Sequence, residues 1–241
     1  MFYNAVLSNT ATKENTVSIL SDVEIAKECD YYPSSEGFKS RVELTGRGLA
    51  VETKRLMISP FIPYQVRSDV TGKDAFRKVI SYGLSSYGYD VRLGDKFKVL
   101  RPISIDGYGL HNVALDPLDP QDNDYIDITP TKDGSITIPP GGFLLGHTLE
   151  QIAVPNDVLI ICLGKSTYAR LGLVVNVTPL EPGWRGQVVI EISNTSTRPV
   201  KVYSGMGIAQ FVFFRGNPCE VTYADRHGKY QDQQGVTTAK P

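Results

Sequence analysis

The segment VLIICLGKSTYARLGLVVNVTPLEPGWRGQVVIEISNTS, residues 158–196, decides the fold of this chain. It holds three short runs rich in Val, Ile and Leu, at 158–164, 171–180 and 186–196, which Gly, Pro and Asn delimit. Short β-branched runs bounded by such residues are typical of strands. Comparable runs recur along the chain from residue 78 onward. The sequence therefore predicts an all-β sandwich or barrel with many hairpins.

The bulk composition excludes several classes of protein. The 241 residues carry a formal net charge of −1, so no overall field favours nucleic acid or a membrane as a partner. The three cysteines are an odd number at wide spacing, which makes a disulfide framework a poor interpretation. We find no signal-peptide pattern, no apolar stretch long enough for a membrane span and no metal-ligand spacing. We therefore expect a cytoplasmic protein without a protein-bound metal.

Segments outside the main β-rich runs are assigned by their patterns. Residues 1–20 are polar, which indicates a loosely held arm. Ser21 with Glu24 three positions later forms a capping box, which predicts a short helix beginning there. Residues 30–60 mix Gly, Pro and charge with short alternating runs, which indicates a small hairpin or an ordered arm. Residues 114–124 combine prolines with aspartates, which predicts a solvated loop.

The first cluster of candidate functional residues follows the apolar run at 158–164. Cations neutralise a polyphosphate and hydroxyls donate hydrogen bonds to it, so this cluster suits a nucleotide triphosphate. Backbone N–H groups at a strand-to-helix turn would add to such a site. An ordinary alternative has equal weight, in which Ser166 only caps a helix. The polar residues of the cluster are Lys165, Ser166, Thr167, Tyr168 and Arg170.

A second cluster lies in TPLEPGWRGQVVIEIS, residues 178–193. Pro and Gly force a turn that carries Glu181 and Trp184, and a strand with two faces follows it. Apolar residues share one face of that strand, and Glu191 lies on the other. Glu191 is a solvated residue if only the apolar face is covered. If it lies instead at the floor of a pocket, burial would raise its pKa toward general acid–base use. The periodicity leaves both interpretations open.

A third cluster lies in the polar C-terminal stretch, which cannot fold by itself. The ordinary interpretation is a solvated, mobile tail, and the alternative is a tail that orders over a bound nucleotide. Elsewhere, Gln210 is a lone amide in an apolar strand and needs a partner from a ligand or a neighbouring subunit. His147 is expected to be a hydrogen-bonded structural residue. The residues of the third cluster are Tyr223, Arg226, Lys229, Tyr230 and Gln233.

Four ordered blocks closely resemble the dCTP deaminase family of the trimeric dUTPase-like superfamily. The resemblance implies a distorted β-barrel or jelly-roll with a short N-terminal helix and small peripheral helices. It also implies a homotrimer with active sites between subunits, and hydrolytic deamination of dCTP to dUTP and ammonia in pyrimidine deoxynucleotide biosynthesis. The blocks are VISYGLSSYGYDVRLGDKFKV (79–99), GKSTYARLGLVVNVTPLEPGWRGQVVIEISNT (164–195), GMGIAQFVFF (205–214) and YADRHGKYQDQQGV (223–236).

The resemblance implies roles for individual residues. Glu191 matches the glutamate that takes a proton from water, while Ser166 and Arg170 match residues that hold this water and stabilise charge. In the family the arginine comes from the adjoining subunit. The backbone amides of Val189 and Ile190 would read the base edge. Residues that match the substrate-binding set are Lys165, Ser166, Thr167, Tyr168, Ala169, Arg170, Val189, Ile190, Glu191, Gln210, Tyr223, Lys229 and Gln233.

The resemblance also bears on cofactors. The family reaction proceeds without zinc, and this chain has neither the H-x-E nor the P-C-x-x-C signature of zinc nucleobase deaminases. Mg²⁺ would be bound through the triphosphate of the nucleotide. In the family dTTP often inhibits, and the resemblance extends that expectation to this chain.

The resemblance divides the chain into an N-terminal arm, helix and insertion at 1–77, a barrel core at 78–222, and a tail at 223–241 that closes over the nucleotide. The lead-in is longer than usual, with an insertion around 30–55. The turn PLEPGW lacks a basic residue that many relatives carry, although Glu181 keeps an acid. Two alternatives stay open. One is a bifunctional enzyme that also hydrolyses dUTP to dUMP and pyrophosphate, and the other is a non-enzymatic nucleotide-sensing trimer.

Overall fold

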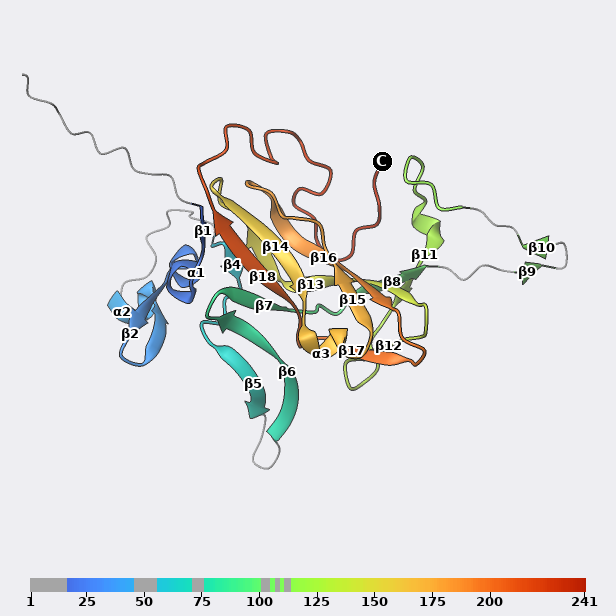
Figure 1. Cartoon of the computed structure of the whole chain (residues 1–241), viewed down its shortest axis with the longest axis horizontal. Helices are drawn as coiled ribbons and strands as arrows, with labels where there is room; N and C mark the ends of the chain where they lie inside the picture. The colour runs from blue at the N-terminus through green and yellow to red at the C-terminus, as the bar shows by residue number, and fades with distance from the viewer. Residues whose placement is uncertain (1–16, 46–55, 71–75, 101–104, 107–108, 111–113) are drawn as a thin grey trace, which may run out of the picture.

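Two six-stranded antiparallel sheets form the body of the protein in this computed structural model, which describes residues 17–45, 56–70, 76–100, 105–106, 109–110 and 114–241 (Figure 1). The first sheet has the order β1-β18-β7-β6-β5, with β14 also paired to β18. Its strands are β1 (Ser18–Ile19), β5 (Gln65–Val70), β6 (Phe76–Ser85), β7 (Gly88–Arg92), β14 (Val158–Gly164) and β18 (Gly207–Arg215).

The second sheet has the order β11-β8-β13-β16-β15, with β4 also paired to β13. Its strands are β4 (Ile58–Ser59), β8 (Phe97–Leu100), β11 (Tyr125–Ile128), β13 (Phe143–Ala153), β15 (Leu173–Asn176) and β16 (Arg185–Asn194). Smaller pairs are β2 (Tyr31–Ser34) with β3 (Gly37–Ser40), β9 (Ile105–Asp106) with β10 (Gly109–Leu110), and β12 (Ser135–Ile138) with β17 (Val200–Tyr203). The all-β expectation is confirmed.

Strict alternation of side chains places the core between these sheets. On β16, every second residue is buried, including Val188, Ile190 and Ile192, whereas Glu191 lies on the opposite face. Phe211 and Phe213 of β18 are fully buried and belong to the same core cluster. Because a period of two puts alternate residues on opposite faces, the two apolar faces meet in one core.

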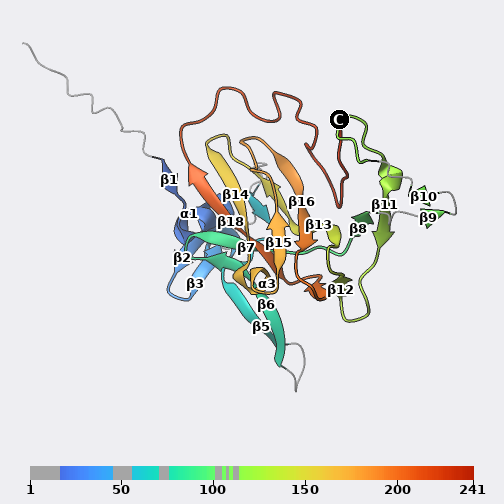
Figure 2. The same ribbon diagram turned by 45° about the vertical axis from the view of Figure 1, so that its right-hand side comes forward.

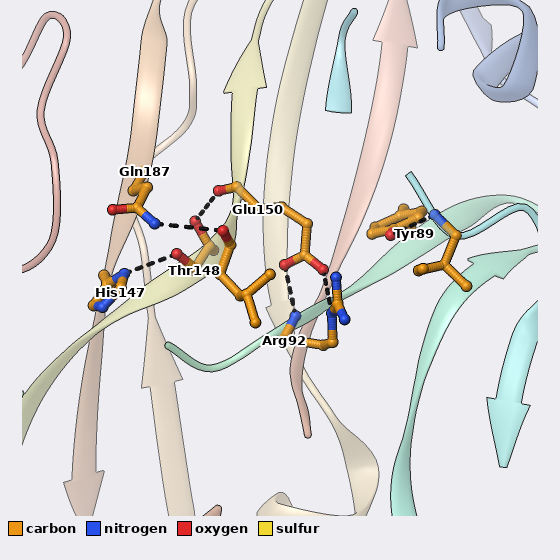
Figure 3. A network of polar contacts seen from close by, with 8 residues as sticks. Tyr89, Arg92, His147, Thr148, Glu150 and Gln187 are labelled. Carbon is orange, nitrogen blue, oxygen red and sulfur yellow. Dashed lines mark hydrogen bonds and ion pairs between the residues drawn. The ribbon is translucent and has the colours of Figure 1, made fainter. Parts of the chain in front are cut away.

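A β-bulge in β13 is pinned by a buried ion pair (Figure 3). The register of β13 on β16 shifts between His147 and Gln151. Inside the bulge, Glu150 is 0% exposed and accepts hydrogen bonds from Arg92 at 2.7 Å through Nε and 2.9 Å through the backbone N–H. Thr148 Oγ1 donates to the Glu150 carbonyl at 2.7 Å and closes the bulge. His147 is buried beside it and serves a structural role, as the sequence suggested.

The helices are short and peripheral. α1 (Asp22–Glu28) begins after Ser21, whose backbone N–H donates to the Glu24 side chain at 2.9 Å, in agreement with the predicted capping. α2 (Arg41–Thr45) was not predicted, but the hairpin before it was. The remaining helices are η1 (Asp122–Asp124), within the predicted solvated loop, and α3 (Ser166–Ala169).

The N-terminal segment is tied to the sheets more closely than its polarity suggested. Ser18 and Ile19, which the sequence placed in a loose arm, pair with β18 as strand β1. β5, from the predicted N-terminal region, forms a hairpin with β6 that extends from the body (Figures 1 and 2). Residues 1–16 of the predicted arm and 46–55 of the predicted insertion lie outside the described residues. The division at residue 77 stays a prediction.

A glycine at the start of β18 tests this packing. A Cβ atom at Gly207 would lie 1.9 Å from the carbonyl oxygen of Ser81 on β6, so Gly207→Ala must push the two strands apart. We expect the free energy of unfolding to fall by about 3 kcal/mol or more, as for a severe overpacking substitution.

Gly216, just beyond the same strand, provides a matched control because its Cβ would meet nothing within 4 Å. Gly216→Ala should change the free energy of unfolding by no more than about 0.5 kcal/mol. Denaturant unfolding of both variants measures the difference. Equal stability of the two variants would contradict the described approach of β18 to β6.

Candidate active site

A pocket of about 320 Å³ opens on the outer face of the second sheet. Phe143 and Leu145 of β13 and Val189 and Glu191 of β16 line it from the sheet. The turn before Trp184 forms a wall, and the C-terminal tail forms another. In both ribbon views the end of the tail runs between β16 and β11 (Figures 1 and 2). The face of β16 that points away from the core is therefore covered as well.

Glu191 is the carboxylate in this pocket whose environment departs most from water. Its Oε2 atom is buried and has no hydrogen-bond partner among the described residues. Burial raises the pKa of Glu191 from 4.5 to about 7, and a hydrogen bond from its own backbone opposes the shift. A carboxylate that titrates near neutrality and keeps an unused lone pair fits a general base. The structure places Glu191 in a pocket, which favours that interpretation over a fully solvated residue.

Cys162 lies on β14 close to this carboxylate. Burial raises the pKa of its thiol to about 12, and the charge of Glu191 adds to the shift. A thiol with so high a pKa stays protonated and is a poor nucleophile. Cys162 packs against the core, as its place in an apolar run predicted.

The C-terminal tail is held over the pocket by hydrogen bonds to β16 and Trp184. The indole Nε1 of Trp184 donates to the Tyr230 carbonyl at 3.0 Å. Gln233 forms a parallel bridge with Gly186, and its Nε2 donates to the Gln187 carbonyl at 2.8 Å. The Gln233 Oε1 atom is buried and has no partner among the described residues. Such an orphaned acceptor inside the pocket is available to a ligand donor.

Charged residues tie the tail to the mouth of the pocket. Arg226 forms an ion pair with Glu181, which lines the pocket from the turn. Arg185 forms a second ion pair with Asp232. The Tyr223 hydroxyl accepts a hydrogen bond from the tail backbone at Tyr230, 3.0 Å away. These contacts favour the ordered tail over the mobile one.

The turn at 165–170 divides into inward and outward side chains. Lys165 is the N-cap of α3, so Ser166 is the first helical residue rather than its cap. Lys165 points inward and pairs with Asp90 at 2.5 Å, and Tyr168 is 2% exposed. Within this turn, the residues exposed to solvent are Ser166, Thr167, Ala169 and Arg170. None of the turn is among the residues that line the Glu191 pocket.

The other predicted site residues fall in several places. Val189, Glu191, Tyr223 and Gln233, which the resemblance assigns to the substrate-binding set, line one pocket. Ile190 is buried in the core. The Gln210 amide donates to Ser85 Oγ at 3.1 Å, and Lys229 donates to the Lys240 carbonyl at 3.1 Å. Gln210 therefore has a protein partner on the first sheet, away from the pocket lining.

Several pocket residues were missed because no local pattern marks them. Leu145 lies directly opposite Glu191 in the β13–β16 register, which only the strand pairing reveals. Tyr125 follows the acidic loop on β11, and Thr237 and Thr238 belong to the polar tail. An aromatic residue after an acidic loop is only a weak sequence signal of a binding site, and the two threonines carry no such signal.

Two further observations on the described residues concern metal binding and membrane insertion. Among them, no group of three or more His, Cys, Asp and Glu side chains is arranged to hold a metal ion. In the same part of the chain, no helix is both long and apolar enough to cross a membrane. The arrangement can bind a planar ring against apolar walls and move a proton at one carboxylate.

Known proteins resemble this chain in sequence over most of its length. A dCTP deaminase of Gluconobacter oxydans is 50% identical over 185 residues, which cover 76% of this chain and 90% of that protein. A dCTP deaminase of Azotobacter vinelandii is 48% identical over 185 residues, which also cover 76% of this chain and 90% of that protein. The crystal structure of a 2′-deoxycytidine 5′-triphosphate deaminase from Agrobacterium tumefaciens is 22% identical, covers 55% of this chain and 39% of that chain, and gives a TM-score of 0.43.

A family model described as dCTP deaminase-like matches residues 47–216. That range contains β16 with Glu191 and the turn at 165–170. Because the model matches more than half of the chain, and relatives about half identical are covered over most of their length, this chain belongs to the dCTP deaminase-like family.

Proposed function

We propose that this protein is a dCTP deaminase, which converts dCTP and water into dUTP and ammonia. The observation that carries the proposal is Glu191, a half-buried side chain with a raised pKa and a buried, unpartnered oxygen, inside a pocket that suits a pyrimidine. Family membership supplies the substrate class, because the curated relatives are named dCTP deaminases. The proposed location is the cytoplasm.

Glu191 acts as the base and then as the acid. It takes a proton from water, and the hydroxide attacks C4 of cytosine to give a tetrahedral centre. The same carboxyl delivers that proton to N3 and then moves the hydroxyl proton to the amine, which leaves as ammonia. A pKa of about 7 lets one group accept and release protons near neutral pH. Backbone carbonyls near Thr178 and Pro179, which line the pocket, orient the water.

The remaining contacts hold the substrate. Trp184 is 4% exposed, and we propose that it packs against the deoxyribose and leaves no room for a 2′-hydroxyl. The N–H groups of Val189 and Ile190 read the base edge. Tyr223 and Gln233, together with exposed Lys229, receive the nucleotide from the tail. We propose that Mg²⁺ is bound through the triphosphate of the nucleotide. dTTP is proposed as an inhibitor of this same pocket.

Ser166 and Arg170 complete the site from a neighbouring subunit of a homotrimer. Both are exposed in the single chain and lie outside the Glu191 pocket, so one subunit alone holds only part of the machinery. Apolar side chains beside the turn are also exposed, namely Leu163 (51%), Leu171 (53%) and Val174 (51%). Apolar residues gathered in this way mark a protein interface. A trimer would cover them and bring the turn to the next Glu191.

A bifunctional enzyme that also cleaves dUTP has less support. The acid that would position a second water is Glu181, and its carboxylate is paired with Arg226. A non-enzymatic nucleotide-sensing trimer would leave the raised pKa of Glu191 without a purpose.

Removing the base tests the proposed reaction. Wild-type protein with dCTP and Mg²⁺ should release ammonia and dUTP without pyrophosphate. Glu191→Gln keeps the shape but cannot accept a proton, so ammonia release should fall by at least about 100-fold while dCTP binding stays nearly intact.

The exposed acid Glu220 gives a control, because Glu220→Gln changes the same charge outside the pocket. Ammonia is followed enzymatically, and dCTP binding by calorimetry. Equal loss of binding and turnover in Glu191→Gln would contradict the assigned role. Stoichiometric pyrophosphate would favour the bifunctional enzyme.

The raised pKa predicts a specific pH profile. Glu191 must be ionised to accept a proton, so kcat/KM should rise with pH up to about 7 and then level off. Protonation of Glu191 does not unfold the protein, so unfolding through this group does not explain a loss of activity at lower pH. Its folded pKa lies above the unfolded 4.5, so its contribution to stability is full below 4.5 and is lost as pH rises through about 7. A plateau that extends down to pH 5 would show an ordinary, solvated carboxylate.

Mixed trimers test the shared site. Co-expression of Glu191→Gln with Arg170→Ala, each with its own affinity tag, allows trimers that contain both chains to be isolated. A mixed trimer contains one copy of one variant and two of the other. In either case one of its three sites combines an intact Glu191 with an intact Arg170 from the neighbouring chain, so activity should recover to about one third of wild type. Homotrimers of either variant serve as controls. Mixed trimers as inactive as the controls would place Glu191 and Arg170 of the same chain in one site.

A further inference from the structure

We propose that the ion pair between Arg185 and Asp232 sets the register in which the C-terminal tail lies against β16. Both are positioning residues. Through the register they place Gln233 in the Glu191 pocket, and neither side chain contacts the nucleotide. The inference rests on the proposed function, because the register matters to turnover only if this pocket binds dCTP. The sequence patterns assign no role to Arg185 or Asp232.

The tail runs beside the start of β16 as a short parallel strand. The Asp232 N–H donates to the Arg185 carbonyl at 2.9 Å. The Gln187 N–H donates to the Gln233 carbonyl at 2.9 Å, and Gly186 forms a parallel bridge with Gln233. These bonds join backbone groups, which every residue other than proline carries, so a tail shifted along β16 could form an equivalent set. Backbone contacts therefore dock the tail without deciding its register.

Successive tail residues point to opposite sides of this short strand. Gln233 lines the Glu191 pocket, whereas Asp232 lines a separate cavity of about 360 Å³. The same alternation on β16 puts Trp184 in the lining of the first cavity and Arg185 in that of the second. Because extended segments have a side-chain period of two, a shift of one residue would exchange the two sets. A contact that fixes Asp232 therefore also fixes the side on which Gln233 lies.

The ion pair is the side-chain contact best shaped to fix that register. Arg185 Nη2 lies 2.7 Å from Asp232 Oδ2, and Arg185 Nε pairs with the other carboxylate oxygen. Two parallel bonds of this kind fix orientation as well as distance. The two side chains are 40% and 55% exposed, so the effect of the pair on tail docking is expected to be modest. Gln151 on β13 supports the same register, because its Nε2 donates to Gln234 Oε1 at 2.5 Å.

The backbone conformation of Asp232 supports a specific role for its side chain. Its φ is 58°, in the left-handed region that glycine adopts most easily. Asp and Asn are the residues with a side chain that tolerate this region best. A glycine at this position would suit the backbone better but could not pair with Arg185. The carboxylate therefore serves the contact with Arg185 rather than the turn of the backbone.

A double-mutant cycle tests whether the pair sets the register. Asp232→Asn keeps the shape and the tolerance of the left-handed backbone but removes the charge, and Arg185→Gln removes the partner. Each should raise the KM for dCTP about three- to fivefold, because the tail then docks less often in the productive register. The kcat at saturating dCTP should stay within about twofold, since bound nucleotide still selects that register. The double variant should raise the KM no further, because both changes remove one contact.

The chain offers a closely matched control for the charge. Asp30 also has a left-handed backbone, with a φ of 62°, and also pairs with an arginine, Arg41, at 2.9 Å. This pair lies beside the β2–β3 hairpin, outside the lining of both cavities. Asp30→Asn should therefore leave the KM for dCTP unchanged. Arg185→Lys keeps a cation opposite Asp232 and should recover most of the wild-type KM.

Hydrogen exchange provides a readout that is independent of turnover. Amides on both sides of the contact are bonded across it, including the Gly235 N–H, which donates to Gln187 Oε1 at 2.7 Å. Backbone amides of residues 232–235 should exchange about three- to fivefold faster in Asp232→Asn, with those of β18 unchanged. Asp30→Asn should not alter exchange at 232–235. Melting temperatures report any general loss of stability.

The outcomes are distinct. A higher KM at constant kcat in both single variants, no further rise in the double variant and faster exchange at 232–235 support the inference. Effects that multiply in the double variant would show two independent contacts, and a fall in kcat at constant KM would show a role in the chemical step; either result overturns it. Unchanged KM and exchange would also overturn it. If wild-type protein releases no ammonia, the proposed function fails, while the exchange measurement still decides whether the pair holds the tail.

Discussion

The buried ion pair between Arg92 and Glu150 is the constraint on which the rest of the structure depends. Glu150 is completely buried, burial raises its pKa, and Arg92 offsets that shift by charge and by hydrogen bonds. The pair joins β7 of the first sheet to the bulge in β13 of the second (Figure 3). Removing one partner from a pair like this costs about 3–5 kcal/mol, because a lone charge remains in the core. The ion pair therefore fixes the position of the first sheet relative to the second.

That bulge also prepares the docking of the tail. Thr148 Oγ1 accepts a hydrogen bond from the N–H of Val188 at 2.9 Å, so the bulge in β13 is bonded directly to β16. Gln187, next along β16, donates to the Leu149 carbonyl at 3.4 Å and accepts from the Gly235 N–H at 2.7 Å. One side chain thus contacts both the bulge and the tail. The cover over the pocket is an extension of the same hydrogen-bond network, and the burial of Glu191 follows from it.

Sequence patterns predicted the elements well and the burial of the site poorly. The strands of 158–196 and the capped helix after Ser21 follow from local periodicity and capping, and both are present. For Glu191, alternation identified the face but could not show that a tail more than thirty residues away covers that face. The same limit applies to Lys165, whose partner Asp90 is 75 residues distant in the chain. Local patterns assign faces and ends, whereas tertiary contacts decide solvation and therefore pKa.

The turn at 165–170 shows what composition alone leaves open about the surroundings of two neighbouring cations. Two cations occur within it, and charge suggested that both meet the triphosphate. Lys165 pairs with a carboxylate of its own chain, whereas Arg170 is exposed and donates a hydrogen bond to the Ser166 carbonyl at 3.2 Å. The two residues carry the same charge and lie five positions apart, yet one side chain is largely buried against a carboxylate and the other faces solvent. Charge can be read from the sequence, whereas the partner of each cation depends on tertiary contacts.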